Sequence, residues 1–106
     1  MSMDFGKLAE QARQMQEELQ RLQEEAATEL VSASAGGGMV KVTATAGGEV
    51  TKIELDPRAL QSDDPDELAD LIVAGVNEAL RAGRALMESK VSAVLPGDLG
   101  GLLPGM

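Results

Sequence analysis

The chain has 106 residues, which is enough for one folded domain and too few for two. It lacks cysteine, histidine, tyrosine and tryptophan, so disulfides, thiolate nucleophiles, the commonest general base and most interface aromatics are excluded. The net charge of -9 opposes long-range attraction to nucleic acid or anionic lipid, so any contact with DNA has to be local.

The N-terminus has no apolar run typical of a signal peptide, and no stretch of about 18 apolar residues appears that could span a membrane. Together with the absence of cysteine, this predicts a cytoplasmic protein that makes no membrane contact. Motifs for a nucleophile, a general base and a cofactor are all missing. We therefore expect no enzymatic activity, no cofactor, no metal ion and no small-molecule substrate.

Residues 5–26 predict a long helix with a heptad seam, because apolar residues alternate at steps of three and four. Glutamine, glutamate and arginine, all good helix formers, fill most other positions. Such a helix would be roughly 35 Å long, more than the rest of this small chain can cover. We therefore expect part of the seam to meet a second subunit. The seam residues are Phe5, Leu8, Ala12, Met15, Leu19, Leu22 and Ala26.

Between residues 29 and 56 the apolar period changes to two, which predicts three antiparallel strands. Residues 40–45 and 50–55 flank a tight turn and predict a hairpin. A weaker strand over 29–35 precedes them, and the three glycines that follow it are more typical of a turn than of a phosphate-binding loop. Alternation in the last strand places the following side chains on one face: Thr51, Ile53 and Leu55.

A second long helix is predicted to start at Asp64 as N-cap, with Pro65 at the first helical position. Acidic residues surround this start, and a helix dipole attracts them there, so capping is preferred over a calcium or magnesium site. Pro96 ends the helix, and the glycine-rich residues 96–106 are expected to form a flexible tail. The apolar stripe runs through Leu68, Leu71, Ile72, Val76, Ala79, Leu80, Gly83, Leu86, Met87, Val91 and Val94.

Small residues recur every four positions on this second helix, at Gly75, Ala79 and Gly83. Glycine inside a helix costs roughly 1 kcal/mol and tends to have a packing reason. Two interpretations stay open. The small residues could admit another backbone from outside the domain, or they could pack on the sheet of the same chain.

Basic residues on the two helices are the candidates for contact with phosphates. Those on the first helix share its outer face with glutamates four residues away, so a solvated, self-paired face is the simpler interpretation. On the second helix, residues 78–94 hold three basic residues against two acidic ones. Arg81 and Arg84 lie opposite the apolar stripe, whereas Lys90 lies near it and can extend along the helix end. The candidates are Arg81, Arg84, Lys90, Lys7, Arg13 and Arg21.

Several segments, taken in order and at their spacings, resemble the YbaB/EbfC family of bacterial nucleoid-associated proteins over essentially the whole chain. They follow the long heptad helix, and they end with a Leu-Pro-Gly-Met tail. The segments are Gly36-Gly37-Gly38-Met39-Val40-Lys41-Val42-Thr43, Ile53-Glu54-Leu55-Asp56-Pro57, Leu68-Ala69-Asp70-Leu71 and Ala74-Gly75-Val76-Asn77-Glu78-Ala79.

The resemblance implies an α+β subunit, with one domain over residues 1–95, that forms a tweezer-like homodimer in the cytoplasm and nucleoid. It also implies binding of double-stranded DNA through the helices, with effects on DNA conformation or packing and on gene expression. The charge of -9 departs from that picture, because it opposes strong non-specific binding. A second function therefore stays open: a dimeric adaptor whose helices and apolar tail engage a protein partner.

Overall fold

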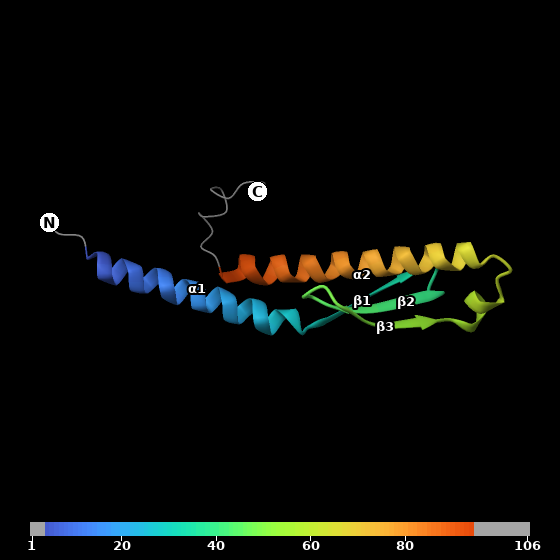
Figure 1. Ribbon diagram of the computed structural model, residues 1–106, viewed down its shortest axis with the longest axis horizontal. Coiled ribbons are helices and arrows are strands. Elements are labelled where there is room, and N and C mark those ends of the chain that lie inside the picture. Colours follow the sequence, from blue (N-terminus) through green and yellow to red (C-terminus); the bar gives the residue numbers. More distant parts are fainter. Residues whose placement is uncertain (1–3, 95–106) are drawn as a thin grey trace.

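The computed structural model describes residues 4–94, so the tail expected at residues 96–106 lies outside the described part of the chain. Along the chain, one long helix precedes a three-stranded sheet and a second long helix follows it (Figure 1). This arrangement confirms the predicted α+β class. The elements are α1 (Phe5–Ala27), β1 (Leu30–Ala35), β2 (Val40–Thr45), β3 (Val50–Leu55), the short 3-10 helix η1 (Pro57–Gln61) and α2 (Pro65–Val94).

Helix α1 is bounded by side-chain caps at both ends. The carboxylate of Asp4 accepts a hydrogen bond from the backbone N–H of Lys7 at 3.0 Å, which satisfies one of the unpaired donors of the first turn. At the other end, the hydroxyl of Thr28 donates to the carbonyl of Glu25 at 3.0 Å. The predicted limits of 5 and 26 therefore agree with the structure within one residue.

The sheet is antiparallel in the order β1-β2-β3, so the central strand β2 pairs on both sides. Val40, Val42 and Ala44 of β2 are fully buried and alternate with Lys41 and its polar neighbours on the opposite face. The weaker first strand is confirmed as a six-residue strand, because every residue of β1 pairs with β2.

The predicted alternation in β3 is wrong at its start, because the ladder contains a bulge. Val50 pairs with Ala44 while Ile53 pairs with Val42, so the register shifts by one residue. Val50, and not Thr51, therefore shares a face with Ile53. A period of two cannot reveal an inserted residue, so sequence reasoning missed it.

Helix α2 begins as predicted, and η1 is an addition that the sequence reasoning did not include. Asp64 accepts hydrogen bonds from the backbone N–H groups of Asp66 and Glu67, at 3.0 and 3.3 Å. From there α2 runs along β1 and β2 and contacts β3 only slightly (Figure 1). The core accordingly lies between α2 and the two strands beneath it.

Small residues bring α2 close to the sheet. Gly75, Ala79 and Gly83 are all buried. A Cβ atom added to Gly83 would lie 2.9 Å from the carbonyl oxygen of Thr45, and one added to Gly75 would lie 3.0 Å from the side chain of Val42. Of the two interpretations above, packing on the sheet of the same chain is the one that the structure confirms.

Candidate nucleic-acid interface

The N-terminal half of α1 stands apart from the rest of the described chain. Every residue from 4 to 18 is exposed, whereas Leu19 and Leu22 are half-buried and Ala26 is buried, because α2 reaches only that part of the seam. Figure 1 shows α1 extending past the end of α2. The expectation that the chain cannot cover its own seam is therefore confirmed for the described residues.

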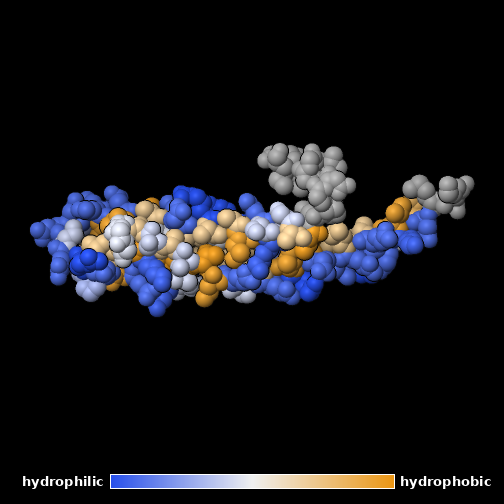
Figure 2. Space-filling view, turned by 180° about the vertical axis from the view of Figure 1, so that it is seen from behind, coloured by the Kyte–Doolittle hydropathy of each residue, from blue (hydrophilic) through white to orange (hydrophobic). Residues whose placement is uncertain are grey.

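Large apolar side chains lie exposed along this half of α1. The exposed fraction is 71% for Phe5, 48% for Leu8 and 39% for Met15. Figure 2, which views the molecule from behind, shows apolar patches following one another from the sheet to the N-terminal end of α1. Such a row on a small protein indicates a surface that meets a partner.

The two arginines of α1 are held by their own helix. Arg13 donates to the carboxylates of both Glu10 and Glu17, and Arg21 pairs with Glu18 at 2.6 Å. The hydrogen bond to Glu10 and the charge of Glu17 together raise the pKa of Arg13. These contacts agree with the self-paired interpretation of the outer face, so each arginine must leave a glutamate before it meets a phosphate.

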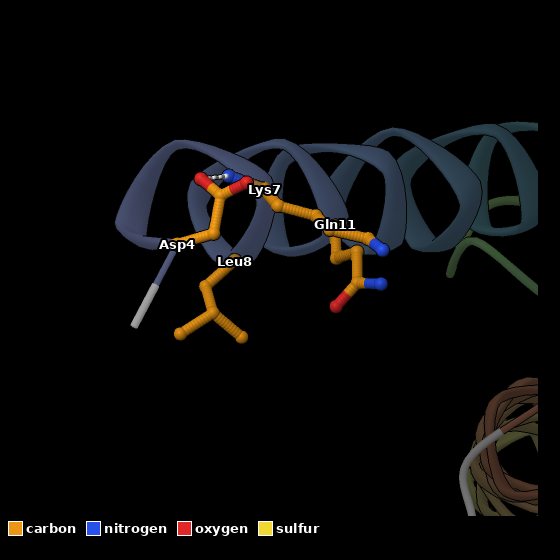
Figure 3. A pocket seen from close by; sticks show the side chains of 4 residues that line it. All are labelled: Asp4, Lys7, Leu8 and Gln11. Carbon is orange, nitrogen blue, oxygen red and sulfur yellow. Dashed lines mark hydrogen bonds between the residues drawn. The ribbon is translucent and has the colours of Figure 1, made fainter. Parts of the chain in front are cut away.

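Lys7 differs from the arginines of α1, because its ammonium group has no ion pair within residues 4–94. It lines a shallow, open cleft with Asp4, Leu8 and Gln11, at the free end of the helix (Figure 3). The carboxylate of Asp4 lies against the helix backbone, and Leu8 and Gln11 project from a different side of the helix.

The three basic residues of α2 have three different surroundings. Arg81 pairs with Glu78 one turn earlier. Lys90 reaches from α2 to Glu29, just after α1, with its Nζ 2.8 Å from the carboxylate, so this lysine ties α2 to the start of the sheet. Arg84 is exposed and has no ion pair in the described part of the chain, which makes it the cation of α2 most accessible to a phosphate.

Sequence reasoning missed one cation with similar accessibility, Lys41. It is exposed on the face of the sheet opposite α2, and among residues 4–94 nothing forms an ion pair with it. Lys41 lies in β2, whereas all the cations considered from the sequence lie on the two helices. Its position in a strand that alternates apolar and polar residues was the signal that could have found it.

Negative charge is high over residues 17–29, where five acidic residues stand against Arg21, and highest at the end of the molecule formed by η1 and the start of α2. Residues 56–70 contain six acidic residues against Arg58, whereas residues 71–94 contain two acidic residues against three basic ones. Figure 1 shows η1 and the start of α2 at the end opposite the free tip of α1. The charge of -9 is therefore unevenly spread, and the later turns of α2 lie outside its most acidic region.

The acidic cluster itself serves the helix start, through the capping bonds of Asp64 described above. Over residues 4–94, no group of three or more acidic side chains is placed to hold a metal ion. Nor does the described part contain a helix long and apolar enough to cross a membrane.

Relatives of this chain carry consistent descriptions. A "Nucleoid-associated protein" of Streptomyces avermitilis is 41% identical over 103 residues, covering 97% of this chain and 91% of the relative. Another, from Saccharopolyspora erythraea, is 43% identical over 109 residues, covering 97% and 94%. A third, from Pelotomaculum thermopropionicum, is 38% identical over 106 residues, covering 100% and 98%.

A crystal structure of an uncharacterized protein from Helicobacter pylori has the same fold, with a TM-score of 0.73 and 23% sequence identity, over 90% of this chain and 100% of the other. The model of the YbaB/EbfC DNA-binding family matches residues 1–99. That family is a DNA-binding, non-enzymatic one, which confirms the expectation that the protein is not an enzyme. The chain therefore belongs to the YbaB/EbfC DNA-binding family.

Proposed function

We propose that this protein binds double-stranded DNA as a homodimer in the nucleoid and alters the conformation or packing of the DNA, with effects on gene expression. The observation that carries the proposal is Arg84. This arginine is exposed, has no ion pair within residues 4–94, and lies on the stretch of α2 where basic residues outnumber acidic ones. Family membership and the names of the relatives support the same function.

The dimer is supported by the uncovered seam of α1. A heptad pattern is stable when its apolar side chains meet a second helix, and Ala12 and Met15 are exposed in the described chain. A two-fold axis would cover the same patch on both copies at once. The dimer would also carry two copies of Arg84 and of Lys7. The few cations of each chain could then contact DNA phosphates at two symmetric places.

Binding should act through phosphates, because Arg81 and Arg84 lie on α2, which contains no aromatic residue that could stack on a base. If Arg81 and Arg84 of both copies contact about four phosphates, the logarithmic salt slope should be near -3.6, at about 0.9 per phosphate. Arg81 can leave Glu78 for this purpose, since exposed ion pairs contribute about 1 kcal/mol or less. Affinity should therefore fall steeply as salt rises.

The test is Arg84→Gln, compared with Arg58→Gln as a matched control that removes the same charge at the acidic end. Titration of a labelled duplex across a salt series should show about tenfold weaker binding for Arg84→Gln, with a salt slope reduced by about 1.8, since two phosphate contacts are lost. The control should change neither value much.

Equal affinity of the two variants would move the DNA contact away from Arg84. If no variant and no parent protein bound duplex DNA, the adaptor function would take its place. An adaptor's apolar contacts would persist at high salt, where phosphate contacts fail.

A further inference from the structure

We infer that the free tip of α1 is an apolar wedge, in which Phe5 and Leu8 insert between base pairs of duplex DNA. The inference rests on the proposed function and deepens it, because it names how the bound DNA would be deformed. Proteins that bend DNA frequently insert phenylalanine or leucine at a base step, unstack that step and kink the duplex by about 20–90°.

The exposed apolar surface of the tip is the first observation. Phe5 is the sole aromatic residue of the chain, and it is the most exposed large apolar residue among residues 4–94, at 71%. Leu8 lies one turn later, so helical spacing puts the two side chains next to each other. A phenyl ring also has a flat face that can stack on an unstacked base.

The tip is also set apart from the rest of the seam. Ala12 follows Leu8 in the heptad pattern, and its small side chain separates the tip pair from Met15 and the apolar residues nearer α2. In the proposed dimer, the helix contact between two copies would be made at Ala12 and Met15, which are exposed and lie nearer α2. Phe5 and Leu8 then lie beyond that contact, in the first turns of α1, the helix that extends past the end of α2 (Figure 1).

The charge around the tip permits approach to DNA. Residues 4–16 carry two acidic and two basic residues, so this segment is neutral in a chain of charge -9. The carboxylate of Asp4 is engaged with the backbone N–H of Lys7, at 3.0 Å. The ammonium of Lys7 has no ion pair among the described residues, so it can meet a phosphate beside the inserted side chains.

Gln11 adds a polar group next to the wedge. Figure 3 shows Leu8 and Gln11 projecting from the same side of α1, while Asp4 lies elsewhere around the helix. A glutamine amide both donates and accepts hydrogen bonds, so it can bond to a base edge in the groove that the wedge opens. The tip thus presents an apolar pair, a cation and an amide within two turns of helix.

The experiment uses Phe5→Trp in the full-length protein. Because the chain has no tryptophan or tyrosine, the new indole is a single fluorescent reporter, and stacking on a base quenches it. Val73→Trp is the matched control, because Val73 is also exposed, at 57%, but lies on α2 near the acidic end. Duplex DNA at low salt should quench F5W emission several-fold and leave V73W emission unchanged.

Anisotropy of a labelled duplex, measured in the same samples, separates the possible outcomes. Binding without quenching of F5W would overturn the wedge and leave DNA binding intact. No binding by any variant would overturn the proposed function. If F5W emission followed protein concentration but ignored DNA, the tip would be buried against a second copy, which also overturns the wedge.

A bending measurement gives an independent readout. Energy transfer between dyes at the two ends of a short duplex should rise when the parent protein binds and should lose most of that rise with Phe5→Ala/Leu8→Ala. The Leu60→Ala/Val73→Ala variant, which removes two exposed apolar side chains near the acidic end, should bend the duplex as the parent does. Full bending by the double variant, at saturating protein, would contradict the wedge.

Discussion

The two long helices have similar apolar periodicity but opposite surroundings. Helix α2 lies on β1 and β2, and its small residues Gly75, Ala79 and Gly83 let it approach the sheet closely. The first four turns of α1 are exposed throughout. An apolar stripe therefore indicates that a helix face is covered, but not by what. Only the small residues of α2 indicate that this helix packs closely on the sheet of its own chain.

The largest expected effect comes from breaking the packed half. Ala79→Asp would bury a carboxylate at a position with no exposed surface, between α2 and the sheet, with no base beside it in the core. An uncompensated buried charge costs about 3–5 kcal/mol, a large part of the stability of a small domain. The free energy of unfolding, measured by urea titration, should fall by that amount.

Ala74→Asp is the matched control, because Ala74 lies on the same helix and is exposed. It adds the same charge with a small change in the free energy of unfolding, about 0.5 kcal/mol or less. Equal losses in the two variants would mean that α2 does not pack on the sheet in solution.

The second prediction concerns the free half of α1. Ala12→Glu/Met15→Glu places two charges in the seam beyond the reach of α2, so it should weaken self-association by about 100-fold or more and leave the fold intact. Light scattering at micromolar concentration should give twice the 11.0 kDa chain mass for the parent and the chain mass for the variant. Unchanged helicity by circular dichroism is the control.

This pair improves on substitutions at Leu19 and Leu22, which sequence reasoning alone would choose for a seam. Those two leucines are half-buried where α2 meets α1, so charges there would disturb the fold and the assembly together. A monomer mass for the parent protein would contradict the dimer. An unchanged dimer of the variant would show that another surface holds the two copies.

The three strands and both helices follow from local signals, as the cap predicted at Asp64 illustrates. The bulge at Val50 does not, because it depends on how two strands pair across the sheet. For the candidate site, helical spacing predicted that Arg84 is accessible. It did not predict that Arg81 forms an ion pair while Arg84 does not. That difference depends on which carboxylate each guanidinium reaches, and a helical face offers several at once.

The smallest expected effect lies at the acidic end, where Asp56 caps η1. Hydrogen bonds from the side chain and backbone of Arg58, the former from Nε at 3.0 Å, lower the pKa of Asp56. A lowered folded-state pKa gives stability that is present above the unfolded value, about pH 4, and is lost as pH falls through the folded value. Asp56→Asn should therefore lower the urea midpoint slightly at neutral pH, and its difference from the parent should shrink as pH falls below the ordinary aspartate pKa of about 4. Because Arg58 is exposed and Asp56 is only half-buried, the effect should also weaken with added salt. No difference between the variant and the parent at neutral pH would assign the role of Asp56 to the backbone cap alone, since an asparagine oxygen can accept the same N–H bond but cannot form the ion pair.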